Sequence, residues 1–188
     1  MKNTIRLVFA FICLTTISFA QNKKDVKKFK IKSATETLTE ITDGKEKTFT
    51  ESFQKFDKSG NVTEEIEYNK DGTFKKKETT KYNKNDDETE KVVFDEKGNV
   101  IKKTVTEYNV NKDKTLETDY DSKDQMTEKT QFGYNAKGEK TFELTTDVQG
   151  KVIKKSIYTY DKNSLKIEKK TTDAGGNILA IKKYTYEY

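Results

Sequence analysis

The stretch Phe94-Asp-Glu-Lys-Gly-Asn-Val100 recurs with variation along the chain and decides its fold. An aromatic residue or Thr is followed by Asp or Asn, and in most copies Gly stands four residues after the first position. Asp or Asn at the start of a turn with Gly at its fourth position is typical of a type I turn, and the Gly supplies the left-handed residue of a G1 bulge. Each copy therefore predicts a three-residue hairpin loop. The turn positions assigned in this way are Asp57, Gly60, Asn69, Gly72, Asp95, Gly98, Asn135, Gly138, Asp147, Gly150, Asp173 and Gly176.

The copies follow one another at a strictly alternating distance. From Phe56 to Tyr186 the first position advances by 12 and 14 residues in turn, so the full period is 26 residues and contains two hairpins. Thr42-Asp43, 14 residues before Phe56, is interpreted as a degenerate copy. Such regularity is typical of a repeat architecture and not of a disordered chain. Turns without Gly, which we expect to be weaker or differently shaped, carry Asp86, Lys112, Asp124 and Ser164.

The segments between the turns favour strands, because they are rich in Thr, Val, Ile, Tyr and Lys and contain no Pro. All ten Tyr residues have even numbers, and from residue 54 to 188 hydrophobic residues occupy 29 even and 9 odd positions. If each loop pairs its first position with the residue six further on, the parity is kept across every turn. We therefore expect one apolar and one polar face. The predicted pairs are Phe56–Val62, Tyr68–Phe74, Tyr82–Glu88, Phe94–Val100, Tyr108–Lys114, Tyr120–Met126, Tyr134–Lys140, Thr146–Val152, Tyr160–Lys166 and Thr172–Ile178.

These patterns predict an all-β fold, an antiparallel meander of about 12 strands curled into a half-barrel, a barrel or a spiral single sheet. In hairpins such as Tyr134–Lys140 we expect Lys stems to lie over Tyr rings. The predicted divisions are a signal peptide (1–20), a leader with the first strand (21–41) and the hairpin repeat domain (42–188). We expect the segment 26–53 to cover apolar residues that stand at odd positions late in the chain: Ile153, Ile157, Leu165, Ile167, Leu179 and Ile181.

The N-terminal residues predict export. Lys2 and Arg6 precede a short apolar run, and the segment 18–20, Ser-Phe-Ala, has small residues where a signal peptidase reads them. We expect cleavage after Ala20 and a secreted, periplasmic or cell-surface protein of a bacterium. The run is too short for a membrane span, so no span is expected in the mature chain. Lipidation of Cys13 is the weaker alternative, because Ile12 stands where a small residue is needed.

The amino-acid composition limits the catalytic and binding chemistry that the chain can perform. The chain is 37% charged and 31% hydrophobic, and it has no His, so Ser-His-Asp and Cys-His pairs and ordinary zinc sites are excluded. We predict no catalytic residue, no metal site and no cofactor. Arg6 is the only Arg, and without residues 1–20 the chain has 35 Lys against 32 acidic residues. Because nucleic-acid recognition relies on Arg forks, no nucleic-acid partner is expected. Segments such as 83–88 have the oxygen-rich composition of calcium loops, but hairpin turns already require Asp and Asn there.

The block from Phe94 to Val100 resembles the YD (Rhs-type) repeat of bacterial secreted and envelope proteins, over roughly residues 56–188. The resemblance implies hairpin strips that spiral into shells and serve as scaffold in toxin-delivery and cell-surface proteins. This chain departs from the family in lacking Arg in the strands, in its stricter spacing and in having no toxin core. A second likeness, to MORN-type repeats, lacks the second Gly of that pattern.

The leading interpretation is an exported, non-enzymatic envelope or extracellular scaffold or binding module with an unknown protein or glycan partner. The alternative is a carbohydrate-binding or adhesin module that uses a Tyr-lined face. Carboxylate pairs such as Glu64-Glu65 leave a glycan hydrolase as a distant alternative. The candidate ligand-binding residues are Tyr108, Tyr134, Tyr158, Tyr160, Tyr184 and Tyr186.

Overall fold

The computed structural model describes residues 23–42 and 45–186, and the predicted signal peptide lies outside this part of the chain. Within it there are one short helix and twelve strands, which pair in sequence order in one antiparallel sheet. The elements are α1 (Lys23–Phe29), β1 (Ser33–Thr42), β2 (Lys45–Phe56), β3 (Val62–Tyr68), β4 (Phe74–Tyr82), β5 (Glu88–Phe94), β6 (Val100–Tyr108), β7 (Lys114–Tyr120), β8 (Met126–Tyr134), β9 (Lys140–Asp147), β10 (Val152–Tyr160), β11 (Lys166–Asp173) and β12 (Ile178–Lys183).

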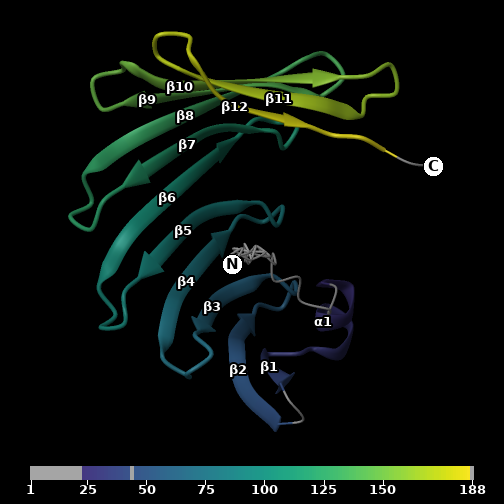
Figure 1. Ribbon diagram of the computed structural model, residues 1–188, viewed down its shortest axis with the longest axis vertical. Coiled ribbons are helices and arrows are strands. Elements are labelled where there is room, and N and C mark those ends of the chain that lie inside the picture. The colour runs from purple at the N-terminus through teal and green to yellow at the C-terminus, as the bar shows by residue number, and fades with distance from the viewer. Residues whose placement is uncertain (1–22, 43–44, 187–188) are drawn as a thin grey trace, which may run out of the picture.

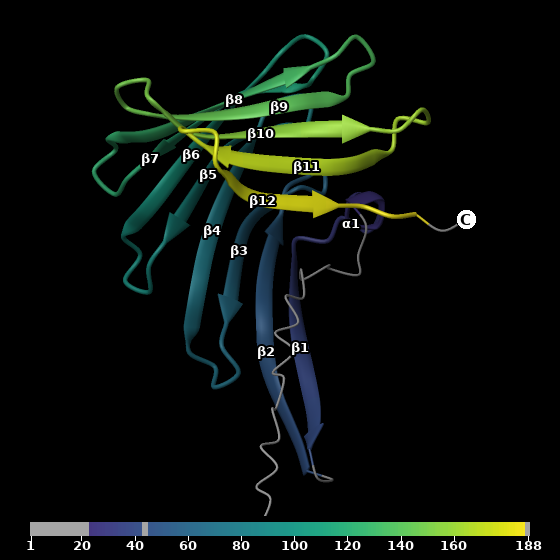
Figure 2. The ribbon, with the colours of Figure 1, turned by 45° about the horizontal axis from the view of Figure 1, so that its top comes forward.

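The sheet is a single curved layer that stays open (Figure 1). β1 and β12 form its two ends and do not pair with each other. Figure 2 shows that the first strands run across the direction of the last ones, as the accumulated twist of adjacent strands requires. The predicted all-β meander of about 12 strands is confirmed, and among the predicted shapes the closed barrel is not the one adopted.

The predicted turn is confirmed at all ten copies of the motif. In the β5–β6 turn, Gly98 N donates to Asp95 O at 3.1 Å and Asp95 N donates to Asn99 O at 2.9 Å. The Asp95 carboxylate accepts the amides of Lys97 and Asn99 at 2.9 and 2.8 Å. Gly98 has a φ of +83°, as the G1 bulge requires.

The four turns without Gly have the same shape, so the expectation of a different shape is wrong. Asp86, Lys112, Asp124 and Ser164 have φ between 61° and 68°, and their turns make the same pair of backbone hydrogen bonds. The hydrogen bonds of the first Asp or Asn hold the residue in the left-handed region. An L-residue is strained in this region, so we still expect these turns to be weaker.

All ten predicted cross-strand pairs are confirmed. The register changes, however, one residue beyond each pair. Phe56 pairs with Val62 but Lys55 pairs with Glu64, which leaves Thr63 as an extra residue. An extra residue moves all later side chains of its strand to the other face. At four such bulges the extra residue is a Thr whose hydroxyl donates to the backbone carbonyl across the hairpin: Thr63, Thr89, Thr115 and Thr127.

The prediction of one apolar face is therefore wrong. Following the register, we assign Tyr82, Tyr108, Tyr134, Tyr160 and Tyr186 to one face, called here the tyrosine face. Phe56 lies on this face too. The first positions of the five hairpins in between lie on the opposite face: Tyr68, Phe94, Tyr120, Thr146 and Thr172.

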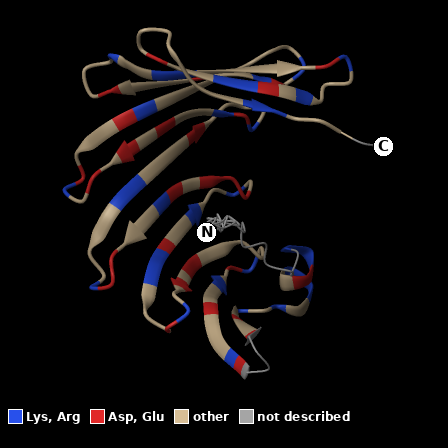
Figure 3. Ribbon diagram, in the orientation of Figure 1, with Lys and Arg blue, Asp and Glu red and all other residues tan. Residues whose placement is uncertain are grey.

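Neither face builds a thick core. Among the described residues, Val26, Phe49 and Tyr158 are the buried apolar ones, with 1%, 9% and 8% of their surface exposed. Charged residues lie along nearly every strand (Figure 3). Most of the buried polar residues are small and lie in mid-strand, such as Thr106, Thr145 and Ser156.

The N-terminal part contains the short helix α1 ahead of the first strand. This helix was not predicted from the sequence. Its Val26 lies beside Ile31 and Phe56, next to the β2–β3 turn. Lys23 of α1 forms a 3.1 Å ion pair with Asp86 in the β4–β5 turn. At the start of the sheet Thr42 pairs with Lys45, so this hairpin is not a copy of the motif.

The late apolar residues are not covered, contrary to expectation. The segment 26–53 lies at the β1 end of the sheet, whereas these residues lie on or next to β10, β11 and β12. Ile153, Ile157, Ile167, Leu179 and Ile181 are between 37% and 59% exposed. The single meander order explains the difference, because it keeps the first and last strands apart.

Candidate functional site

Lysines and aromatic rings alternate along a line on the tyrosine face from β7 to the residue that follows β12. This lysine–aromatic ladder consists of Lys114, Phe132, Lys140, Tyr158, Lys166 and Tyr184. Successive Nζ-to-ring-centroid distances are 5.7, 5.2, 5.0, 5.7 and 4.8 Å. These distances are within the range of cation–π attraction.

The 26-residue period explains the ladder. Each ladder lysine is the first residue of a strand and pairs with the first position of the motif, as Lys140 pairs with Tyr134. Each ladder ring stands two residues before such a position, so it lies on the same face. We expected the lysines over the rings of the paired tyrosines. The Nζ groups of Lys140 and Lys166 lie instead over the ring two residues before the paired tyrosine and over the equivalent ring of a neighbouring strand. Lys114 reaches only such a neighbouring ring, Phe132.

Glu143 is the charged centre of the ladder. Its two carboxylate oxygens accept hydrogen bonds from Lys140 Nζ at 2.5 Å and from Lys169 Nζ at 2.9 Å. Burial alone raises the pKa of Glu143, but hydrogen bonds from Lys140, Tyr158 and Lys169 outweigh it and lower the pKa to about 2. Burial, followed by the neighbouring Glu143, raises the pKa of Tyr158 to about 12. Glu143 is therefore a fixed anion at neutral pH.

The tyrosines that end β4, β6 and β10, and Tyr186 three residues beyond β12, hold the sheet together through their hydroxyls. Each donates to the carbonyl of the residue 20 positions earlier: Tyr82 to Val62 at 2.9 Å, Tyr108 to Glu88 at 2.8 Å, Tyr160 to Lys140 at 3.0 Å and Tyr186 to Lys166 at 2.7 Å. Tyr134 also interacts with the backbone of Lys114, 20 positions earlier. Burial first, and then Glu88, raises the pKa of Tyr82 to about 12.

The structure brings all six candidate ligand-binding tyrosines onto the tyrosine face, in two neighbouring rows. Tyr158 is covered by Lys140, Lys166 and Lys169 and is 8% exposed. Tyr186 is the most accessible of the six, at 45%. The rest are half-buried: Tyr108, Tyr134, Tyr160 and Tyr184.

The predicted site residues do not include Lys114, Phe132, Glu143 or Lys169. A signal was present, because Lys114, Lys140 and Lys166 recur with the period of the tyrosines. Their convergence with the rings depends on the bulges, which the parity argument did not include. Glu117, Glu143 and Lys169 also stand one period apart, but the change from Glu to Lys at the last position hides their relation, and Glu143 and Lys169 meet only through the sheet.

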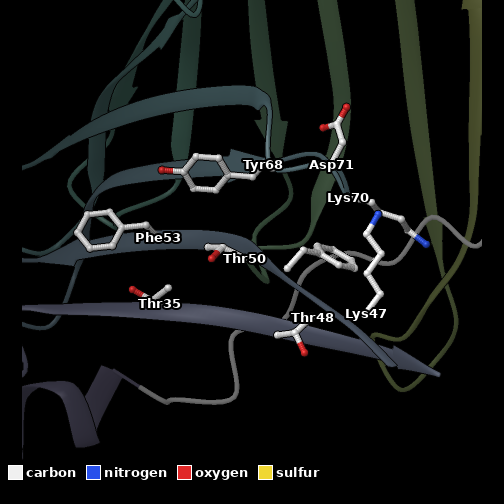
Figure 4. A pocket seen from close by; sticks show the side chains of 10 residues that line it. Thr35, Lys47, Thr48, Thr50, Phe53, Tyr68, Lys70 and Asp71 are labelled. Atoms are coloured by element: carbon white, nitrogen blue, oxygen red, sulfur yellow. The ribbon is translucent and has the colours of Figure 1, made fainter. Parts of the chain in front are cut away.

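A shallow groove of about 660 Å³ lies at the other end of the sheet, on β1, β2 and the β3–β4 turn (Figure 4). The rings of Phe53 and Tyr68 lie at one end of it, and Lys47 and Lys70 lie at the other. Lys70 is held in an ion pair with Glu40. Half of the lining residues are Thr and Lys, three are aromatic, and Asp71 is the one carboxylate among them.

Two further features are absent from the described residues. No group of three or more His, Cys, Asp or Glu side chains in this part of the chain could hold a metal ion. No helix between residues 23 and 186 is long and apolar enough to cross a membrane.

No protein family model and no curated protein matches this sequence. Solved structures that resemble it include a protein of unknown function from Bacteroides fragilis, with 12% identity and a TM-score of 0.35, over 80% of this chain and 94% of that one. TarM matches 64% of this chain with 17% identity and a TM-score of 0.27, and the TcdB2–TccC3–TEV structure matches 80% with 13% identity and 0.26. This chain spans 21% of TarM and 11% of the TcdB2–TccC3–TEV chain.

Proposed function

We propose that this chain is an exported, non-enzymatic β-repeat protein that acts as a scaffold or binding module at a bacterial envelope. The observation that carries the proposal is the lysine–aromatic ladder on an open face of a single-layered sheet. Because its members recur with the structural repeat, equivalent contacts are offered at regular intervals. Such a surface suits a polymer with a repeating structure.

The chemistry of the ladder fits an acidic glycan. Lys166 has no ion pair within the described residues, so its ammonium group can meet a carboxylate or sulfate, whereas Lys114 and Lys140 are paired with Glu117 and Glu143. The half-buried rings of Phe132 and Tyr184 can contact the C–H groups of a sugar ring. Charge and apolar contact are therefore available side by side.

The behaviour of the carboxyl groups supports a non-enzymatic role over a glycan hydrolase. A glycosidase needs a general acid whose pKa is raised. Each described carboxyl group with a shifted pKa has it lowered: Asp57, Glu64, Glu67, Asp71, Asp86, Asp95, Asp121, Glu139, Glu143 and Asp173.

We further propose that the hairpins are repeats of the YD type and that residues 1–20 direct export. The first point is supported by the motif from Phe94 to Val100, whose Asp and Gly occupy the turn positions that such a repeat requires. The second rests on the charged, apolar and small-residue pattern of the N-terminal segment.

A second candidate is a module that binds neutral carbohydrate through its tyrosines. The observation in its favour is Tyr186, whose ring is 45% exposed beside the half-buried Tyr184 at the β12 end of the sheet. Ring stacking on a neutral sugar does not need lysines, so the two candidates differ in their dependence on Lys166.

Calorimetric titration of the full chain with polygalacturonate and with neutral dextran tests both candidates. We expect binding of the acidic polymer, and a Lys166→Gln variant should bind it about 3–10-fold more weakly, because one charge contact contributes about 1 kcal/mol. Lys155→Gln makes the same charge change on the opposite face and should bind like the wild type. Equal binding of dextran would favour the second candidate, and binding of neither polymer would overturn both.

A further inference from the structure

The last strand leaves one of its edges without a partner in the described chain. β12 pairs with β11 on one side only. Tyr184 N donates to Ile167 O in β11, so by alternation the backbone groups of Lys182 also face β11 and those of Ile181 and Lys183 face away. Ile178, Leu179 and Ile181 are 54%, 59% and 48% exposed. The edge is therefore apolar along most of its length and has free donors and acceptors.

The first strand has a matching open edge. β1 pairs only with β2 within the described residues, and its Leu38 is 37% exposed. The charged residues of β1 are two acids, Glu36 and Glu40, whereas those of β12 are two bases, Lys182 and Lys183. Opposite charges on adjacent strands stabilise their pairing. The two edges are thus complementary in charge, chiefly through Glu36, because Glu40 is already paired with Lys70 of its own chain.

The number of strands makes the directions of these edges compatible. In an antiparallel meander each strand reverses the direction of the one before it, and the sheet has twelve. A second copy that continues the sheet beyond β12 therefore places its β1 antiparallel to β12. This is the relation that all neighbouring strands of the chain already have.

We propose that β12 of one copy pairs with β1 of a second copy, so that successive chains form one continuous sheet. The contact is heterologous, because it joins two different edges. It therefore leaves one free edge at each end of the assembly for further copies. The inference does not depend on what the ladder binds.

Sedimentation velocity of the full chain over a range of concentrations tests the proposal. The wild type is expected to form larger species as the concentration rises. Ile181→Pro should abolish them, because it removes a backbone donor that faces away from β11 and leaves the pairing inside the chain intact. An unchanged thermal unfolding midpoint verifies that this variant is folded.

Reversing the charges on β12 and on β1 tests whether these two strands are the ones that pair between copies. A chain with Lys182→Glu and Lys183→Glu and a chain with Glu36→Lys and Glu40→Lys should each stay monomeric alone and should associate when mixed. A wild type that is monomeric at all concentrations overturns the proposal. So does association that depends on the β12 lysines but not on the β1 acids, because it would indicate pairing of two β12 strands.

Discussion

The turn residues with positive φ place the strictest local requirement on the backbone conformation of this fold. Gly98 has a φ of +83°, and a Cβ added there would meet nothing within 4 Å, so only the backbone conformation resists substitution. Lys112 occupies the equivalent place with a φ of 68°. Substitutions at Gly98 and Lys112 therefore measure the effect of backbone strain apart from that of side-chain packing.

Gly98→Val should lower the free energy of unfolding by about 1–3 kcal/mol, because a β-branched residue is strained at positive φ. The reciprocal change, Lys112→Gly, should raise it by about 1 kcal/mol by releasing the strain of an L-residue. Urea unfolding of both variants measures the two effects. A Gly98→Val midpoint equal to that of the wild type would show that the bulge assignment is wrong.

The lowered pKa of Glu143 predicts a pH dependence of stability. The group has an ordinary pKa of 4.5 and a folded-state pKa of about 2, so its stabilising effect is complete above the ordinary value and is lost as pH falls toward 2. After allowance for solvent screening, we expect about 1–2 kcal/mol at neutral pH. Glu143→Gln should therefore lower stability more at neutral pH than at about pH 3. An equal loss at both would contradict the prediction.

Tyr108→Phe tests the hydroxyls that cross to a neighbouring strand. The change removes the hydrogen bond to Glu88 O and leaves that carbonyl without this donor, which should cost about 1 kcal/mol. Tyr120→Phe is the matched control, because the Tyr120 hydroxyl makes no hydrogen bond within the described residues. Chemical unfolding of the two variants should separate them, and equal losses would argue against a structural role for the hydroxyl.

At the scale of the elements, the bulge after each hairpin controls which face every side chain occupies. In β8 the register places Gly133 opposite Phe142 of β9. A Cβ on Gly133 would lie 2.0 Å from Phe142 Cε1, so the ring covers the glycine. Aromatic cover of a strand glycine in this way stabilises a pair of strands.

Gly133→Ala should therefore destabilise the β8–β9 pair by about 1–3 kcal/mol, because the ring must move from its position. Adding Phe142→Leu should make the alanine much less costly, so the double variant should be more stable than the sum of the single changes predicts. Thermal unfolding of the four proteins completes the cycle. Strict additivity would show that the ring does not rest on Gly133.

For the whole molecule, the unit of construction is the 26-residue double hairpin. Deleting residues 88–113 removes one complete unit and brings Lys114 to the place of Glu88 beside Tyr82. Every later strand keeps its direction and its face. We therefore expect a folded protein with two strands fewer, cooperative unfolding and the circular dichroism of a β-sheet.

Deleting residues 88–99 is the contrasting change, because it removes a single strand and turn. It reverses every later strand and exchanges the faces of all later side chains. This variant should unfold at a much lower temperature than the 26-residue deletion. If both deletions are equally stable, the face assignments are not important for the fold.

Much of the architecture could be predicted because it depends on short-range interactions. The turn at Asp95 is closed by hydrogen bonds among five consecutive residues, so the motif alone predicts it and the pairing of Phe94 with Val100. The bulge at Ile101 could not be predicted from even and odd positions, because Ile101 becomes an extra residue only when β6 pairs with β5. The helix α1 was missed because seven residues are too short to show a helical period.

The sequence by itself determined the hairpins, their order and their first cross-strand pairs, since each is specified by local turn chemistry repeated at a fixed spacing. Only the tertiary structure decided which rings share a face, where Lys169 meets Glu143 across β10, and which edges remain open. These features depend on register, twist and curvature accumulated over many strands. The forces that set them act between strands, whereas the motif specifies interactions only within each turn.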